Sequence, residues 1–327
     1  MGYIQSILIS SLLCLLACSR GAVASQSPTS SNPPVIGILS QEYSVSSKIR
    51  FHFSGHKSYI SASYVKAVEA SGAMVVPILI GQSEDYYEDI MGRINGLVIP
   101  GGAALFNNTD GYKDAGKVLF HIAEKINLKG DHFPILGVCL GFELLLHVAN
   151  NEQEVRTKCN CFNQGLSLKF MKNGSKTGIF KRFPKKNLKA LAKESFTYNY
   201  HIWCISKSTM EKTKLVDSWT ILSQSQSADK NKFVSAVQSK QFPFVGTQFH
   251  PEKHAFEWNT KGHFNHSRIA IETSRLFYDW LVDEAKKNKH CYPSQADLYK
   301  DVIYNTAPVM TYPYNDETSF EQLYFFD

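Results

Sequence analysis

The sequence lacks the features that identify several large classes of protein. It has no long run of Lys or Arg, and its 327 residues carry a formal net charge of only +6. Nucleic-acid binding is therefore a poor interpretation, because proteins that bind nucleic acid gather basic residues into a patch. Beyond the N-terminus, no apolar segment is long enough to cross a membrane, and there is no internal repeat or second independent core. What remains is a folded protein of ordinary composition, long enough to bury a sizeable core.

The N-terminus predicts a signal peptide. Ile4 to Ala17 is apolar apart from small polar residues, and Ala22-Val23-Ala24 fits the small-x-small rule for signal peptidase. We therefore predict a signal peptide over 1–24, a disordered Ser/Pro leader over 25–34 and a single domain over 35–327, with no membrane contact after cleavage. A bacterial lipoprotein signal ending at Cys18 is the alternative.

Three sequons agree with passage through the secretory pathway. We predict glycosylation at Asn107, Asn173 and Asn265, each of which begins an Asn-x-Ser/Thr motif. Sequons arise by chance, so they carry weight only together with the signal peptide. The expected location is extracellular, or the lumen of a lysosome or vacuole.

Cysteine is scarce, and its odd count is informative. Of seven residues, two leave with the signal peptide, and the mature chain keeps Cys139, Cys159, Cys161, Cys204 and Cys291. In an oxidising compartment one thiol is left over, and Cys139 is the natural candidate. The other four can pair, but their connectivity stays open. A zinc site at Cys159-x-Cys161 is the rival interpretation; we predict no metal, because the spacing is one residue rather than two and no matching pair follows.

Apolar runs alternate with helical patterns through the first half of the chain. We expect strands at 35–39, 74–78, 96–100 and 133–136, and helices at 58–71, 83–92 and around 118–126. This alternation predicts an α/β fold with a doubly wound, mainly parallel sheet and helices on both faces.

The second half of the chain follows a different pattern. Short strand-like runs between 152 and 240 predict an antiparallel extension at one edge of the sheet. The parallel core returns at 244–250, and a long helix ending near Leu281 packs back on the sheet. The tail from Cys291 is rich in Tyr and Phe, and we expect it to wrap the surface.

Two motifs carry the chemistry. Gly137-Val138-Cys139-Leu140-Gly141 directly follows an apolar strand, which predicts the cysteine version of a nucleophile elbow. We predict that Cys139 is the nucleophile, with its pKa lowered by the start of the following helix. A second apolar strand ends at His250, with Glu252 two residues on. We predict that His250 is the base and that Glu252 orients it.

The backbone around these motifs predicts an oxyanion hole. The N–H of Leu140 follows the nucleophile, and the Pro100-Gly101-Gly102 turn ends another strand, so Gly102 offers a second donor. The alternative interpretations are a buried core cysteine, a structural histidine and an ordinary turn. The pairing of the two motifs favours catalysis over each of them.

The motifs resemble those of the γ-glutamyl hydrolase family, which belongs to the class I glutamine amidotransferase-like superfamily. The resemblance runs from about Val35 to the C-terminus. It rests on Gly137 to Glu143, Phe249 to Trp258, Ser58 to Lys66, Pro100 to Gly102, Asn199 to Trp203 and the closing Phe325-Phe326-Asp327.

The resemblance implies an activity and further site residues. It implies hydrolysis of the γ-glutamyl amide bonds of poly-γ-glutamyl folates, a small-molecule substrate, with no cofactor. It places Tyr64, Glu143 and His201 at the substrate site and implies no disulfide role for Cys204. A homodimer is allowed for. The rival functions are a glutaminase of the class I amidotransferase type and an inactive secreted binding protein on the same scaffold.

Overall fold

The architecture is taken from a computed structural model, which describes residues 33–43, 55–311 and 320–327. The predicted signal peptide and nearly all of the predicted leader lie outside these ranges. Pro33–Asp327 forms one compact unit. Within the described ranges, none of the helices combines the length and the apolar character needed to span a bilayer.

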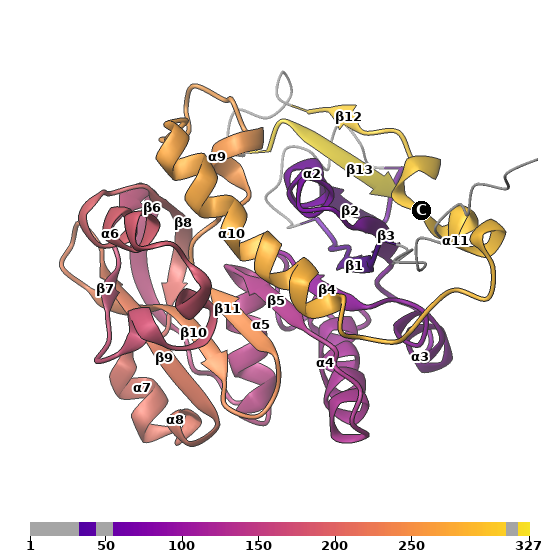
Figure 1. Cartoon of the computed structure of the whole chain (residues 1–327), viewed down its shortest axis with the longest axis horizontal. Helices are drawn as coiled ribbons and strands as arrows, with labels where there is room; N and C mark the ends of the chain where they lie inside the picture. Colours follow the sequence, from indigo (N-terminus) through magenta and orange to yellow (C-terminus); the bar gives the residue numbers. More distant parts are fainter. Residues whose placement is uncertain (1–32, 44–54, 312–319) are drawn as a thin grey trace, which may run out of the picture. The chain divides into compact units, whose positions relative to one another are not determined.

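An eight-stranded sheet organises the chain, in the order β3-β1-β4-β5-β11-β10-β9-β7 (Figure 1). The first five strands are parallel: β3 (Met74–Ile78), β1 (Val35–Leu39), β4 (Gly96–Ile99), β5 (Ile135–Val138) and β11 (Phe244–Thr247). The last three extend the sheet in antiparallel fashion: β10 (Lys232–Ser239), β9 (Trp219–Gln226) and β7 (Lys169–Phe170). The predicted fold class is therefore confirmed.

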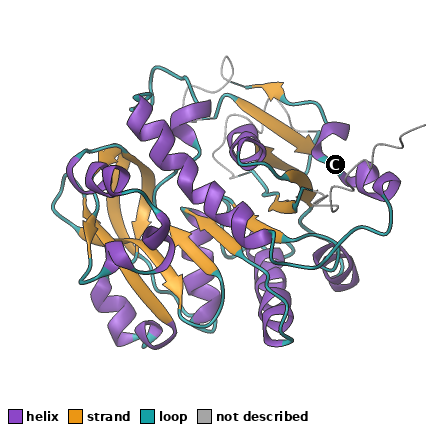
Figure 2. Cartoon of the chain, viewed as in Figure 1, coloured by secondary structure: helices purple, strands orange, loops and turns teal. Residues whose placement is uncertain are grey.

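Helices cover both faces of the sheet, because its central strands are apolar on both sides (Figure 2). In β4, Val98 packs into one core cluster, while Leu97 and Ile99 pack into the other, as the alternation of side chains along a strand requires. The first cluster includes side chains of α2 (Ala62–Ala70) and α10 (Arg268–Ala285). The second includes α3 (Glu84–Met91), α4 (Tyr112–Leu128) and α5 (Leu140–Ala149).

The remaining helical elements are short. They are η1 (Gly174–Lys176), η2 (Gly178–Arg182), α6 (Lys185–Lys193), α7 (Lys207–Lys212), α8 (Leu215–Ser218), α9 (Lys253–Phe256), α11 (Gln295–Asp301) and η3 (Ile303–Asn305). Five of them, from η1 to α8, lie between 152 and 240, where strands were expected.

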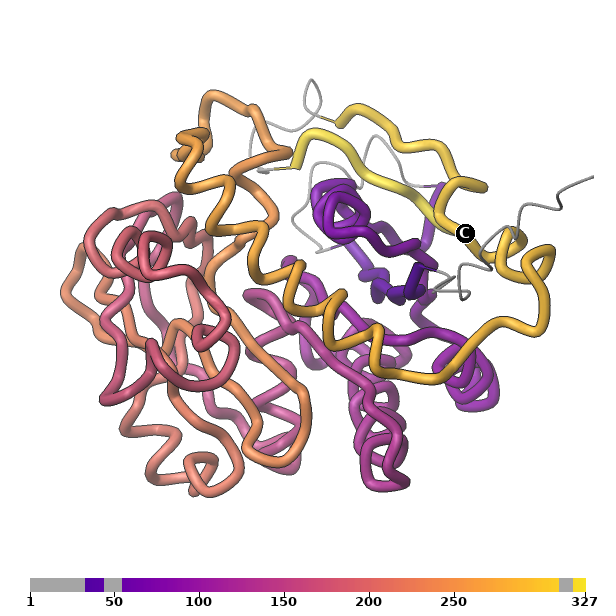
Figure 3. The backbone as a smooth tube through the Cα atoms, viewed as in Figure 1, coloured from indigo at the N-terminus to yellow at the C-terminus, as the bar shows by residue number. Residues whose placement is uncertain are grey.

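The helix expected over 58–71 begins later than predicted. Its first four residues form β2 (Ser58–Ser61), which pairs with β13 (Gln322–Phe326), and β12 (Val309–Met310) completes a small sheet. Figure 3 shows this C-terminal segment, in yellow, running beside the N-terminal part of the fold. The partner strand lies at the far end of the sequence, so local periodicity could not reveal the strand.

The antiparallel region also differs from the expectation in one respect. β6 (Thr157–Leu166) and β8 (Thr197–Cys204) form a two-stranded sheet of their own and do not extend the main sheet. The strand at 157–166 was not predicted, because its Cys, Asn and Gln residues hide the alternation typical of strands.

The C-terminal strand provides a test of how the tail is held. Leu323 is fully buried in a small apolar cluster with Tyr59, Phe320 and Phe325, whereas Met310 on the neighbouring β12 is half exposed. We expect Leu323→Ala to lower the free energy of unfolding by about 2 to 5 kcal/mol, because it leaves a cavity. The control Met310→Ala is expected to change it by about 0.5 kcal/mol or less. Urea unfolding measures both, and equal effects would contradict the packing described for β13.

Candidate active site

Cys139 lies on a strained turn between β5 and α5. Its backbone angles are φ 50° and ψ −105°, a left-handed region that a residue with a side chain seldom adopts. The flanking glycines permit the turn: a Cβ on Gly141 would lie 1.9 Å from the carbonyl oxygen of Ile99. The sharp strand-to-helix turn expected from the sequence is present, and it sets the thiol at the end of a central strand.

The pairing of β5 with β11 brings the two predicted motifs to the same edge of the sheet. The N–H of Cys139 donates to the carbonyl of Thr247, the last residue of β11, at 2.7 Å. Three residues later, the N–H of His250 donates to the carbonyl of Tyr198 on β8 at 2.8 Å. The ends of three strands thus fix the positions of the thiol and the imidazole.

Gly101 marks the point where these side chains meet. A Cβ placed on this glycine would lie 2.7 Å from Cε1 of His250, 2.8 Å from the hydroxyl of Tyr64 and 2.9 Å from Cβ of Cys139. Cβ of Cys139 and Cε1 of His250 are therefore no farther apart than the sum of their two distances from that point. The predicted Pro100-Gly101-Gly102 turn is glycine-rich because no side chain fits between the thiol and the ring.

His250 is paired with Glu252 inside the protein. Nδ1 of His250 lies 2.7 Å from Oε1 of Glu252, and both side chains are buried. A proton on Nδ1 is donated to the carboxylate, which leaves Nε2 as the basic nitrogen. The hydroxyl of Tyr64 accepts the N–H of Gly101 at 2.8 Å and lies 3.3 Å from the same Nδ1. Tyr64 therefore links the glycine turn to the His–Glu pair.

Burial dominates the protonation of these groups. It raises the pKa of the Cys139 thiol well above its ordinary value, and the carboxylates of Glu143 and Glu252 raise it further. The expectation that the start of α5 would lower the thiol pKa is therefore not met: hydrogen bonding by the N–H of Leu140 acts in that direction but is outweighed. Burial also lowers the pKa of His250 against the opposing effect of Glu252. Both shifts favour a neutral thiol and a neutral imidazole in the free enzyme.

The carboxyl of Glu252 stays ionised. Burial opposes its charge, but His250 and Lys253 outweigh burial and hold its pKa below the usual value. Its second oxygen, Oε2, has no hydrogen-bond partner among the described residues.

Of the two predicted oxyanion donors, the structure places the N–H of Leu140 beside the thiol, while the role of Gly102 stays a prediction. The N–H of Leu140 is the first of α5 and already interacts with the thiol of Cys139. The N–H of Gly101 donates to the hydroxyl of Tyr64 and is therefore not available to an oxyanion. Within the glycine turn, Gly102 is left as the proposed second donor. Gln41 fixes this turn by donating from Nε2 to the carbonyl of Gly101 at 2.8 Å.

Glu143 lies one helical turn beyond the nucleophile. Its Oε1 accepts a hydrogen bond from Nε2 of Gln248 at 3.0 Å, and its Oε2 lies 3.4 Å from the guanidinium of Arg156. Burial raises the pKa of Glu143 to about 7, although Arg156 acts against it. The same guanidinium stacks 4.0 Å from the ring centre of Phe106 and 5.4 Å from that of Trp203. Sequence reasoning named Glu143 but missed Arg156, since no motif contains it.

Lys253 was also missed, although it directly follows the histidine motif. It is fully buried, and its Nζ lies 4.0 Å from the ring centre of Phe320. Burial lowers the pKa of Lys253, while Glu257 and Glu252 raise it. A buried lysine beside Glu252 supplies positive charge close to the thiol, and this lowers the pKa of Cys139 against the larger effect of burial.

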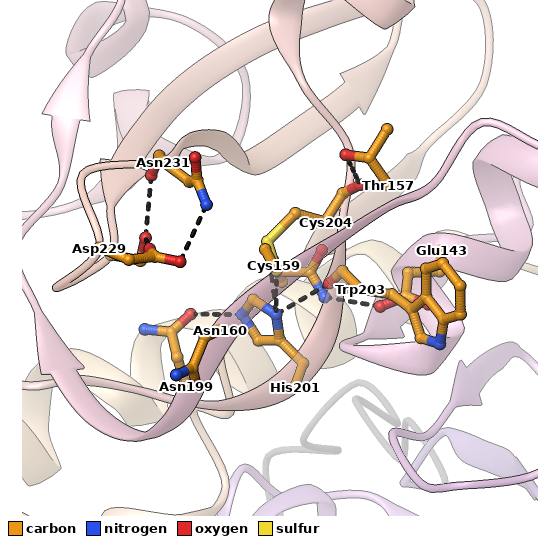
Figure 4. The surroundings of a disulfide bond; sticks show 12 residues. Glu143, Thr157, Cys159, Asn160, Asn199, His201, Trp203, Cys204, Asp229 and Asn231 are labelled. Carbon is orange, nitrogen blue, oxygen red and sulfur yellow. Dashed lines mark hydrogen bonds between the residues drawn. A yellow bond between two sulfur atoms is a disulfide. The ribbon is translucent and has the colours of Figure 1, made fainter.

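His201 lies beside a disulfide. On β8 its ring contacts the Cys159–Cys204 disulfide, with Nδ1 3.7 Å from each sulfur (Figure 4). Burial, assisted by His250, lowers the pKa of His201 to about 3. Among the described residues, none of its hydrogen bonds reaches the Cys139 site. The substrate-site role of His201 stays a prediction.

The disulfide corrects the cysteine analysis. Cys204 is bonded to Cys159, although the family resemblance implied no such role for it. Cys161 is a buried free thiol and Cys291 an exposed one, so the four cysteines outside the elbow form one bond and not two. Cys139 is free, as expected.

The three sequons occupy different surroundings. Asn107 and Asn173 are exposed, whereas Asn265 is partly buried and its Oδ1 accepts the N–H of Ser267 at 2.9 Å. Glycosylation at these positions stays a prediction.

A free cysteine on a strand–helix turn beside a buried His–Glu pair is the arrangement of a cysteine-type hydrolase. A model of the Peptidase C26 family matches residues 34–252, a segment that begins just before β1 and ends at Glu252. The chain belongs to this family of cysteine-type hydrolases.

Relatives from distant organisms match nearly the whole chain. It is 36% identical to the gamma-glutamyl hydrolase of Mus musculus over 321 residues, which cover 97% of each protein. It is 32% identical to gamma-glutamyl hydrolase B of Dictyostelium discoideum, over 91% of this chain and 84% of that protein. The gamma-glutamyl hydrolase of Homo sapiens is also 32% identical, over 97% of this chain and 98% of that protein.

Glu143 gives a pH-dependent test of this site. It keeps its proton up to about pH 7 in the folded protein, whereas in the unfolded chain a glutamate ionises near pH 4.3. The native state therefore binds more protons between these values, and this contribution to the free energy of unfolding falls as the pH rises. In the wild type, we expect this carboxyl to lower the free energy of unfolding by about 3 kcal/mol between pH 4.5 and pH 7.5. Glu143→Gln is expected to lack this fall. Urea unfolding of both proteins at several pH values measures it, and parallel pH profiles would contradict the buried, protonated carboxyl.

Proposed function

We propose that this protein hydrolyses the γ-glutamyl amide bonds of poly-γ-glutamyl folates through a thioester on Cys139. The observation that carries the proposal is the meeting of Cys139, His250 and Tyr64 over Gly101, beside the buried Glu252. Membership of the Peptidase C26 family and the gamma-glutamyl hydrolase relatives support the same reaction.

Attack and proton transfer are coupled in the proposed first step. The resting thiol of Cys139 is neutral, because burial and two nearby carboxylates oppose the thiolate. The sulfur therefore gives its proton to Nε2 of His250 as it adds to the γ-carbonyl carbon. Glu252 holds the opposite nitrogen at 2.7 Å and stabilises the imidazolium that forms.

The rest of the cycle uses the same groups. The N–H groups of Leu140 and Gly102 are the proposed donors to the oxyanion. His250 returns its proton to the leaving nitrogen, so that a γ-glutamyl peptide or glutamate departs. Water activated by His250 then hydrolyses the thioester and releases the shortened folate. The residues present complete this cycle without assistance from a further group.

We propose positioning roles for two of the three residues implied by the resemblance. Tyr64 contacts both the glycine turn and His250, and Glu143 accepts a hydrogen bond from Gln248 and pairs with Arg156 near the thiol. For His201, the substrate role still rests on the resemblance alone, because its ring contacts the disulfide.

The location and assembly of the protein are finer points of the same proposal. We propose that it enters the secretory pathway and acts extracellularly or in a lysosomal or vacuolar lumen, which the sequence of residues 1–24 supports. The homodimer stays a prediction. Expression in cultured cells, followed by glycosidase treatment of the medium and of the cell fraction, tests the location. A glycosidase-sensitive protein without residues 1–24 is expected, and an uncleaved, glycan-free protein would contradict it.

The nucleophile is tested with a matched pair of cysteine variants. We expect the wild type to shorten a folate pentaglutamate and Cys139→Ala to leave it intact, a loss of about a thousandfold or more, since no thioester can form. Cys291→Ala removes the exposed free thiol and is expected to retain wild-type activity. Mass spectrometry of the products distinguishes the outcomes. Equal products from wild type and Cys139→Ala would remove the proposed nucleophile, whereas cleavage of free glutamine alone would favour the glutaminase.

A further inference from the structure

A second cluster of reactive side chains lies between β6 and β8. Sγ of Cys159, Cys161 and Cys204 and a ring nitrogen of His201 all lie within 4.8 Å of one another. Strand pairing creates the cluster, because Cys161 lies directly opposite His201 in the register. The one-residue spacing of Cys159-x-Cys161, with no matching pair after it in the sequence, predicted no metal. The missing pair, His201 and Cys204, comes from β8.

The spacing of these atoms suits a tetrahedral metal ion. With Zn–S distances of about 2.3 Å and Zn–N distances of about 2.0 Å, neighbouring sulfur and nitrogen ligands of a tetrahedral ion lie about 3.5 Å apart. Nδ1 of His201 is 3.7 Å from the sulfurs of both Cys159 and Cys204. Only the bond between those two sulfurs is incompatible with a metal site, since it brings them closer than two ligands of one ion can lie.

Both ring nitrogens of His201 face hydrogen-bond acceptors, an arrangement that favours a cation at one of them. Nδ1 lies 2.8 Å from the carbonyl oxygen of Trp203, and Nε2 lies 3.2 Å from Oδ1 of Asn199. The amide nitrogen of Asn199 donates to the carbonyl of Thr197 at 2.7 Å, which fixes Oδ1 toward the ring. Both neighbours are acceptors, yet a neutral imidazole carries one proton. In the neutral ring, one of the two nitrogens therefore faces an acceptor with no proton between them.

A metal ion on Nδ1 resolves this conflict. The single proton then sits on Nε2 and is donated to Asn199, which is the outer hydrogen bond that metal-bound histidines commonly make. Nδ1 gives up its contact with the carbonyl of Trp203. Figure 4 shows the ring of His201 with Asn199 on one side and the disulfide on the other.

We propose that reduction of the Cys159–Cys204 disulfide converts this cluster into a zinc site with three cysteine ligands and one histidine ligand. A small thiol or dithiol supplies two electrons and two protons: the S–S bond breaks, Cys159 and Cys204 become thiols, and the reductant becomes a disulfide. Zn²⁺ then binds the three sulfurs and Nδ1 and releases three protons. In the oxidised protein only Cys161 and His201 remain as ligands, and no site exists.

The test compares metal binding by the full chain before and after reduction. After gel filtration with Zn²⁺, we expect about one zinc per chain for protein reduced with a phosphine and about none for oxidised protein. Co²⁺ in place of zinc is expected to give the sulfur-to-metal and ligand-field absorption of a tetrahedral thiolate site. Absence of bound metal in the reduced protein would overturn the proposal.

Variants separate this site from the other thiols. Cys161→Ser keeps the disulfide pair and is expected to weaken zinc binding by the reduced protein at least tenfold. The loss of one sulfur ligand is expected to weaken the sulfur-to-cobalt absorption. Cys291 and Cys139 lie outside the cluster, so the reduced Cys291→Ser and Cys139→Ala proteins are expected to retain about one zinc per chain. Loss of zinc in Cys139→Ala would assign the metal to the Cys139–His250 site and overturn the proposal, as would unchanged binding by Cys161→Ser. Circular dichroism checks the fold of each variant, and His201→Gln gives an independent loss of one ligand.

Discussion

The parallel pairing of β5 with β11 is the constraint on which the site depends. It ends with the hydrogen bond from the N–H of Cys139 to the carbonyl of Thr247. That bond holds the strained turn of Cys139 at the edge of the sheet where the chain leaves β11 toward His250. Because both strands are buried on both faces, the pairing cannot slip without exposing apolar side chains. A rigid scaffold thereby supplies the alignment that two distant segments need for catalysis.

The electrostatics of the site follow from its burial. The thiol, imidazole and carboxyl groups are enclosed, so each ionisation depends on a partner and not on water. Glu252 keeps its charge because His250 and Lys253 lie close, whereas Glu143 has only the more distant Arg156 and Gln248 and gains a proton near pH 7. Two buried carboxyl groups, Glu143 and Glu252, therefore differ in charge below about pH 7. The arrangement delays charge separation at the thiol until a substrate carbonyl is present to receive the sulfur.

Much of this was predictable from sequence, for identifiable reasons. Buried parallel strands read as short apolar runs, and the glycines around Cys139 predicted the turn, because local geometry determines both. β2 escaped prediction because its partner strand β13 lies at the far end of the sequence, and β6 because its polar residues hide the alternation of a strand. Arg156 and the cluster around His201 escaped because only the fold brings their partners together. The fall in thiol pKa expected from the helix was wrong because burial, a property of the whole fold, outweighs it.

The central claim is that the sulfur of Cys139 carries the acyl group during turnover. Rapid acid quenching of the enzyme during hydrolysis of a poly-γ-glutamyl folate, followed by digestion and mass spectrometry, tests it most directly. The account predicts a pteroyl-glutamyl adduct on the peptide that contains Cys139, released by hydroxylamine as a thioester should be. Turnover with no adduct on that peptide, or with the adduct on another residue, would contradict the account.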